Sequence, residues 1–279
     1  MRLIYLFWFP LGCLLSVGLT VLWLTEGDLS RTNYWSIQVG WFATISQALY
    51  PWRIFFENVT QLGDALVLLP LISVLIVYRP QIWAGFFGAI PLGVLLSAGG
   101  KYLAAIPRPG AVLDPSIYTA VGGIKGYHSF PSGHTITIFT IMTVILLVLI
   151  PTIQRRAQFS LFVFGFLIAS FIALSRVAVG VHWPLDLVAG AGLGYLAGMS
   201  GVMLTQRYQH WWHWLKAEKN QFIFGTIMLA WSCGHFKRLL RGSDNTDIIV
   251  WIAATLGLMT SFYLLYRSAQ YYLKKPSFQ

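Results

Sequence analysis

The sequence predicts an all-α, polytopic membrane protein built as a bundle of transmembrane helices. Of the 279 residues, 57% are hydrophobic and only 10% are charged, whereas about a quarter of the residues of a soluble domain are charged. The apolar residues also gather into repeated runs that reach or approach the roughly 20 residues needed to cross a bilayer as a helix. Composition and run length therefore predict the same fold class.

The N-terminal part of the chain predicts one span followed by a more polar segment. Residues 3–24 form an apolar run without a small-residue cleavage site near its end, so we expect an uncleaved transmembrane helix. Residues 25–58 are too polar to span, yet aromatic and aliphatic residues recur there at near-helical spacing. This segment is expected either to lie in the membrane interface or to cap the bundle.

The next two spans are expected at residues 62–78 and 82–105. Asp64, near the start of the first of these, has two interpretations. It is either a functional carboxylate within the membrane or, as the sequence favours, an acid stabilised by the dipole of the first helical turn. The Pro- and Gly-rich segment at residues 106–133 is long enough to fold over a site as a loop, although a plain connection is the alternative.

Three further spans complete a predicted six-helix core, at residues 134–150, 159–175 and 184–204. The last of them contains Gly190, Gly194 and Gly198. A glycine at every fourth position leaves one face of a helix without side chains, so a neighbouring helix can approach closely. We interpret this row as a packing feature.

The C-terminal part predicts two additional spans. Residues 1–205 are expected to form the core, and residues 206–279 a basic, aromatic linker followed by apolar runs at 222–236 and 248–267. The first run is short enough to be re-entrant, but eight spans are preferred because they return the C-terminus to the side of the N-terminus.

Loop charges predict the orientation of the bundle. With the N-terminus inside, ten Lys and Arg residues fall on the inner side and nine on the outer side. Three of the outer nine, Lys101, Arg108 and Arg176, belong to the candidate site described next, so the remaining bias places positive charge inside. The net charge of +10 is spread along the chain rather than gathered on one face, so nucleic-acid binding is not expected.

Chemically active side chains form three clusters at the ends of apolar runs, all on the predicted outer face. They are Lys101 with Arg108-Pro109, then Pro131-Ser132-Gly133-His134, and then Ser175-Arg176 with His182 and Asp186. Arginine forks match phosphate oxygens, and a lysine adds a point charge. Ser132 and Gly133 precede an apolar run, where the free N–H groups of a helix start favour an anion. The sequence therefore predicts a phosphate site at one membrane face.

The two histidines are suited to different tasks at such a site. Pro184 is well placed to be the first residue of a helix, and Asp186 would then lie in the first turn, within reach of His182. A carboxylate on one ring nitrogen fixes the tautomer and leaves the other nitrogen free to attack phosphorus. His134, from a different run, is the candidate acid for the leaving oxygen.

Metal and disulfide sites are not expected. Three cations crowding one place disfavour a dication beside the histidines and Asp186, and a metal held by His210 and His213 of the linker lacks a third ligand. Cys13 and Cys233 each lie in an apolar run, which is not a disulfide framework. No cofactor is expected.

The three clusters resemble the signature of the phosphatidic acid phosphatase type 2 superfamily at every position. The resemblance implies metal-independent dephosphorylation, with His182 as the nucleophile, Asp186 as the residue that orients it and His134 as the acid. It also implies that Lys101, Arg108, Ser132, Gly133 and Arg176 bind the phosphate. Bacterial membrane members act on lipid phosphates and pyrophosphates at the periplasmic face of the inner membrane, such as phosphatidylglycerophosphate and undecaprenyl pyrophosphate.

The resemblance therefore implies a lipid phosphatase whose partner is a lipid phosphate. The alternative is a phosphotransferase that passes phosphate from undecaprenyl pyrophosphate to lipid A or another acceptor, and an acceptor pocket formed with the two extra spans would favour it. A transporter without chemistry is disfavoured because the charges lie at the ends of apolar runs and no internal repeat is present. The lipid, the preference between monophosphate and pyrophosphate, and the oligomeric state are not predicted.

Overall fold

A computed structural model describes residues 8–114, 126–242 and 247–274 of the protein. Within these residues the chain forms helices and no strands, which confirms the all-α fold class. Residues 115–125 of the predicted 106–133 loop lie outside the described residues, as does the N-terminal basic residue Arg2. The helices are α1 Trp8–Leu24, α2 Arg31–Ser36, α3 Val39–Leu49, η2 Tyr50–Trp52, α4 Arg53–Gln61, α5 Ala65–Leu71, α6 Leu75–Tyr78, α7 Pro80–Ala104, α8 Pro109–Val112, α9 Gly133–Leu149, η3 Ile150–Thr152, α10 Arg155–Ala178, α11 Pro184–Arg207, η4 Gln209–Leu215, η5 Glu218–Asn220, α12 Gln221–Leu240 and α13 Ile248–Lys274.

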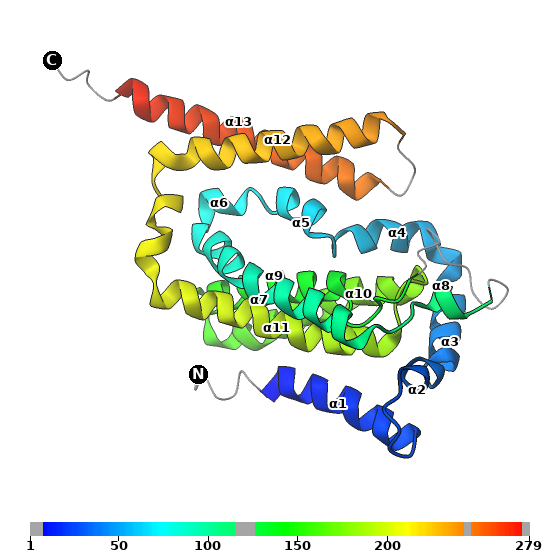
Figure 1. Ribbon diagram of the computed structural model, residues 1–279. Coiled ribbons are helices and arrows are strands. Elements are labelled where there is room, and N and C mark those ends of the chain that lie inside the picture. The colour runs from blue at the N-terminus through cyan, green and yellow to red at the C-terminus, as the bar shows by residue number, and fades with distance from the viewer. Residues whose placement is uncertain (1–7, 115–125, 243–246, 275–279) are drawn as a thin grey trace.

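The long helices lie roughly side by side in layers (Figure 1). Helices α7, α9, α10 and α11 form the central layer, and α11 contacts α1, α7, α9 and α10. Helix α1 covers one side of this layer, whereas α4 to α6 and then the α12–α13 hairpin cover the other. The central layer holds the candidate site residues, and the outer layers fix its position.

The glycine row of α11 accounts for the close approach of α9, as the spacing predicts. A Cβ at Gly194 would overlap the backbone oxygen of Ile136, and one at Gly198 would lie 2.6 Å from the backbone oxygen of Thr140. Thr140 uses the short separation to donate a hydrogen bond of 3.1 Å from its hydroxyl to the backbone oxygen of Gly194. The interpretation of this row as a packing feature is confirmed.

Five described helices are long and apolar enough to cross a membrane, namely those at Pro80–Val112, Gly133–Thr152, Arg155–Ala178, Pro184–Arg207 and Ile248–Lys274. The chain is therefore an integral membrane protein. A sixth crossing would come from Arg31–Gln61 with Ala65–Leu71, a pair bent by 71° that is either a broken span or a re-entrant loop. The described part of α1 has 17 residues, and α12 carries charges in its last turn, so the count of eight spans stays a prediction.

The expected span at residues 62–78 is broken rather than continuous. Its helical turns are divided between α5 and α6, and Pro70 lies inside α5. Proline has no backbone N–H and its ring crowds the preceding turn, so it interrupts a helix. Asp64 begins α5 by accepting a hydrogen bond of 2.9 Å from the Leu66 amide, as the helix-start interpretation predicts.

The segment expected at residues 25–58 packs on the bundle. Phe42 is fully buried, and its ring meets the Trp183 ring with a centroid distance of 5.3 Å. Gln38 accepts a hydrogen bond of 2.8 Å from the Leu185 amide at the start of α11. Of the two expected interpretations, the geometry matches a cap on the bundle.

The α12–α13 hairpin braces the broken segment. The Ser73 hydroxyl donates to the Thr260 hydroxyl at 2.9 Å, and His235 Nε2 lies 2.8 Å from the Leu66 backbone oxygen. These contacts hold α5 from the side that faces away from the central layer (Figure 1). The hairpin is thus a support for α5 and the turn after it.

Candidate active site

The three motif clusters meet at one end of the central layer. Lys101 lies in the last turn of α7 and Arg176 in the last turn of α10, while Ser132 caps the start of α9 and Asp186 lies in the first turn of α11. Because neighbouring helices run in opposite directions, two C-terminal ends and two N-terminal ends share this face. It is the end near α8 in Figure 1.

His182 and Asp186 form a buried pair. His182 Nδ1 lies 3.1 Å from Asp186 Oδ2, and the residues are 2% and 0% exposed. The pair forms because Pro184 begins α11, which places Asp186 at the third helical position. From there the carboxylate also accepts a bond of 3.0 Å from the Trp183 amide. One carboxylate therefore caps the helix and holds the imidazole.

Two further donors hold the same carboxylate, and sequence reasoning missed both. The Ser129 hydroxyl donates to Asp186 Oδ2 at 2.5 Å, and the Tyr34 hydroxyl donates to Oδ1 at 2.8 Å. Ser129 lies close to the second cluster in sequence, so a polar side chain there was a usable signal. Tyr34 lies 152 positions away from Asp186, and nothing in its local sequence marks it.

The environment of His182 keeps its ring neutral at ordinary pH. Burial lowers the pKa of His182 to about 4, while the hydrogen bond to Asp186 opposes that shift. The carboxylate engages Nδ1, which leaves Nε2 without a hydrogen-bond partner among the described residues. A neutral imidazole with its lone pair on Nε2 is the form that can act as a nucleophile.

The three motif cations lie around the two histidines. Arg108 and Arg176 interact electrostatically with His182. These two and Lys101 interact with His134. Arg176 is 7% exposed and donates to the Thr60 hydroxyl at 2.5 Å, while its Nε has no partner among the described residues. Arg108 donates from one terminal nitrogen to the Val181 backbone oxygen at 3.2 Å. Lys101 Nζ lies 3.2 Å from where a Cβ of Gly133 would be. Positive charge thus converges on the start of α9 from three directions.

The second cluster supplies the helix start expected from its sequence. Ser132 caps α9, with its hydroxyl oxygen accepting from the Thr135 amide at 3.4 Å and from the Thr135 hydroxyl at 3.0 Å. His134 follows within the first turn and packs against Gly63, where a Cβ would lie only 2.8 Å from the Cβ of His134. The histidine therefore faces the turn that joins α4 to α5.

A groove of about 510 Å³ runs from this end into the bundle between α5, α7 and α9. Its polar end contains Asp64, Ser97, Lys101, Gly133 and His134. Its deeper part is lined by apolar side chains, among them Leu69, Phe86, Ile90, Val94 and Ile136. The groove therefore joins the cationic end to a space suited to an apolar chain.

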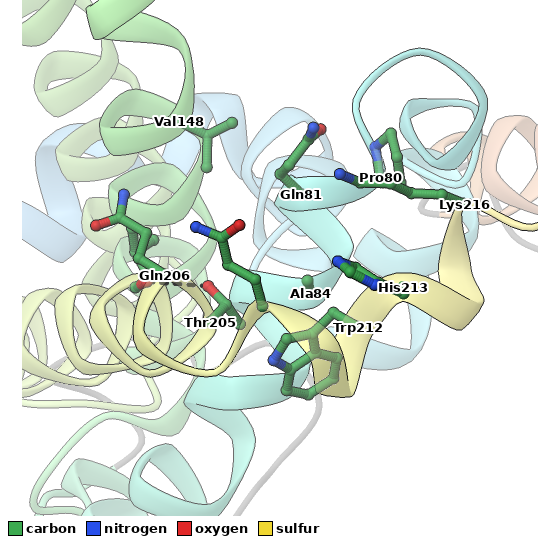
Figure 2. Close-up of a pocket in the computed structure, with 11 residues that line it drawn as sticks. Pro80, Gln81, Ala84, Val148, Thr205, Gln206, Trp212, His213 and Lys216 are labelled. Atoms are coloured by element: carbon green, nitrogen blue, oxygen red, sulfur yellow. Dashed lines mark hydrogen bonds between the residues drawn. The ribbon is translucent and has the colours of Figure 1, made fainter.

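Figure 2 shows a different cavity, of about 300 Å³, at the opposite end of the central layer. This cavity is lined by the start of α7 with Gln81, by the end of α11 with Gln206, and by His213 and Lys216 of the linker. None of the predicted site residues lines it. Within the described ranges no group of three His, Cys, Asp or Glu side chains is arranged to hold a metal ion.

The fold and the three clusters define an integral-membrane domain with a cationic, histidine-containing site at one face. Residues 82–212 match the family model of the PAP2 superfamily, and this range contains every residue of the three clusters. The match is to the same superfamily that the three clusters resemble.

Curated relatives are similar over part of their length. An undecaprenyl-diphosphatase of Sulfolobus acidocaldarius is 30% identical over 134 residues, which cover 47% of this chain and 60% of the relative. A lipid A 1-phosphatase of Porphyromonas gingivalis is 30% identical over 153 residues, which cover 53% of this chain and 30% of the relative. The chain thus spans less than two thirds of either relative.

A solved structure shows the same fold. The crystal structure of the first transmembrane PAP2 type phosphatidylglycerolphosphate phosphatase from Bacillus subtilis superposes with a TM-score of 0.53 at 22% sequence identity. The superposition covers 72% of this chain and 97% of that chain. It supports the helical architecture described above.

Proposed function

We propose that the protein is a membrane lipid phosphatase that hydrolyses a phosphate monoester or pyrophosphate of a lipid through a phosphohistidine intermediate. The observation that carries the proposal is the buried His182–Asp186 pair, with its free Nε2 in a site surrounded by three cations. The groove that leads from the site into the bundle supports a substrate with an apolar chain. Relatives named for undecaprenyl diphosphate and lipid A support the same substrate class.

The reaction has two steps. His182 Nε2 donates its lone pair to phosphorus, and the bond between phosphorus and the leaving oxygen breaks with its electron pair on that oxygen. His134 supplies the proton that neutralises the leaving group. Water then attacks the phosphohistidine, His134 accepts a proton from that water, and the P–N bond breaks to release phosphate and restore His182.

The chain's own cations stabilise the charge of the transferring phosphoryl group. Arg176 is held by Thr60 and has a free Nε, and Arg108 and Lys101 approach from other helices. The amides at the start of α9, preceded by Ser132 and Gly133, add further donors. With this charge supplied by the protein, we propose a metal-independent reaction.

Hydrolysis is favoured over transfer to a second lipid. A transferase needs a pocket for the acceptor, and the expected source of that pocket was the pair of C-terminal helices. The residues that line the groove come from α5 and the turn before it, α7 and α9, while α12 and α13 brace α5 from behind. We place the site at the periplasmic face of an inner membrane, in agreement with the positive-inside bias of the loops.

The test is phosphate release by the purified protein in detergent with EDTA present. The panel contains undecaprenyl pyrophosphate, phosphatidylglycerophosphate, phosphatidic acid and lipid A, with H182A as control. Release from at least one lipid, lost in H182A, is expected. Labelled phosphate that appears on a second lipid instead would identify a transferase, and equal release by H182A would reject His182 as the nucleophile.

A further inference from the structure

A carboxylate lies at the polar end of the groove, among the cations. Asp64 shares that end with Lys101, Gly133 and His134, and its charge acts on the Arg176 guanidinium. One of its oxygens caps α5 through the Leu66 amide at 2.9 Å. The cap does not use the second oxygen, Oδ2, which has no hydrogen-bond partner among the described residues.

A hydroxyl group lies beside the same position. Ser97 Oγ is 3.3 Å, and Lys101 Nζ 3.2 Å, from where a Cβ of Gly133 would be. Ser97 makes no side-chain hydrogen bond within the part of the chain that the structure describes. The polar end of the groove thus presents a cation that suits phosphate and, next to it, a carboxylate and a hydroxyl that suit a different partner.

The position of His134 indicates which part of the substrate meets Asp64. His134 is the proposed proton donor to the leaving oxygen, so the leaving group lies on the side of the phosphoryl group that faces His134. Asp64 and Ser97 line the groove on that side. A carboxylate accepts hydrogen bonds from hydroxyl groups and repels a second phosphate, because like charges in a partly desolvated site are unfavourable.

We propose that Asp64, with Ser97, recognises a hydroxyl group on the leaving part of the substrate. The preferred substrate class is then a phosphate monoester of a lipid whose headgroup is a polyol, a glycerol or a sugar, rather than a prenyl pyrophosphate. This inference rests on the proposed phosphatase function and narrows it. It also assigns Asp64 a role in specificity besides its role as a helix cap.

The test compares three substrates in matched variants. Phosphatidylglycerophosphate has a hydroxyl on its leaving part, next to the carbon that bears the scissile phosphate, and its phosphodiester lies further along the headgroup. Phosphatidic acid with the same acyl chains has no such hydroxyl, and in farnesyl pyrophosphate a second phosphate is bonded directly to the scissile oxygen. The variants D64S and D64N both keep a residue that caps a helix well, which separates substrate recognition from folding. Asp28 accepts a hydrogen bond from the Ser30 amide outside the groove, so D28S is the matched control.

We expect D64S to lower kcat/KM for phosphatidylglycerophosphate by at least about tenfold, since a hydrogen bond to a charged group is lost. The value for phosphatidic acid should change by less than about twofold, and that for farnesyl pyrophosphate should rise. D64N should shift the preference in the same direction, and D28S should leave all three values unchanged. Equal changes for the three substrates would reject the role of Asp64 in specificity and would leave the proposed phosphatase function in place. A wild-type protein that hydrolyses none of these three substrates and none of the four lipids of the earlier panel would reject the proposed function, and this inference with it.

Discussion

The hydroxyl of Tyr34 should be required for full turnover although it lies outside the motif. Y34F removes a hydrogen bond of 2.8 Å to Asp186 Oδ1 and keeps the ring, which meets the Phe130 ring edge-on with a centroid distance of 5.5 Å. A hydrogen bond to a charged group contributes about 1.5–3 kcal/mol. That corresponds to a loss of about 10- to 150-fold in rate if the whole bond acts in the transition state.

The structure places the expected loss at the lower end of that range. Asp186 keeps three partners in Y34F, namely the Ser129 hydroxyl, the Trp183 amide and His182 Nδ1, and all three engage Oδ2. The Asp186 carboxylate can then rotate, but its Oδ2 stays beside His182. We expect kcat to fall by about tenfold, while KM changes by less than about twofold because the cations that we propose bind the phosphate are untouched.

The assay is steady-state phosphate release by Y34F in detergent, with the thermal midpoint measured on the same samples. Y50F is the matched control and should behave as wild type, since among the described residues the hydroxyl of Tyr50 accepts a hydrogen bond of 3.0 Å only from the exposed Arg53. A kcat within about twofold of wild type, or a change confined to KM, would refute the idea that Tyr34 positions Asp186.

Two further predictions concern the proposed nucleophile and the packing of the bundle. Because burial lowers the pKa of His182 to about 4, its ring should stay neutral as the pH falls from 8 to about 5.5 and gain a proton only below that range. NMR of histidine-labelled protein, with the signal assigned by its loss in H182A, measures this, and a midpoint near 6.5 would contradict it. G198A places a Cβ 2.6 Å from the Thr140 backbone oxygen, so α9 and α11 must separate at a cost of about 1–3 kcal/mol. The thermal midpoint of G198A should therefore fall. G18A is the control, because a Cβ at Gly18 would have no atom within 4 Å, and its midpoint should not fall. If the two variants had equal midpoints, the helices would accept the extra Cβ at Gly198 without a cost in stability.

The motif residues could be located from the sequence because local rules place them. Pro184 starts a helix, which puts Asp186 in the first turn, and Ser132 is a preferred residue at a helix start. Both features follow from a few neighbouring residues. Since the clusters fall at alternate ends of successive spans, topology alone brings them to one face. Their meeting was therefore predictable before any side chain was placed.

The residues that support the motif were not predictable in the same way. Tyr34 and Gln38 reach α11 from a segment that the sequence marks only as too polar to span. Thr60 meets Arg176 across 116 positions, and a lone threonine at the end of a helix has many other uses. Such contacts depend on how the outer layer packs, and helix periodicity does not encode that packing.

The bend of 71° between the segment that ends with α4 and helix α5 places two residues at the candidate site. The turn after α4 brings Gly63 against His134, and the restart at α5 brings Asp64 to the polar end of the groove. The break exposes backbone groups that a lipid environment would not satisfy, and the α12–α13 hairpin covers that side, with His235 on the Leu66 backbone oxygen. The C-terminal helices are thus connected through α5 to the site where we propose the chemistry takes place, although they lie in a different layer from the His182–Asp186 pair.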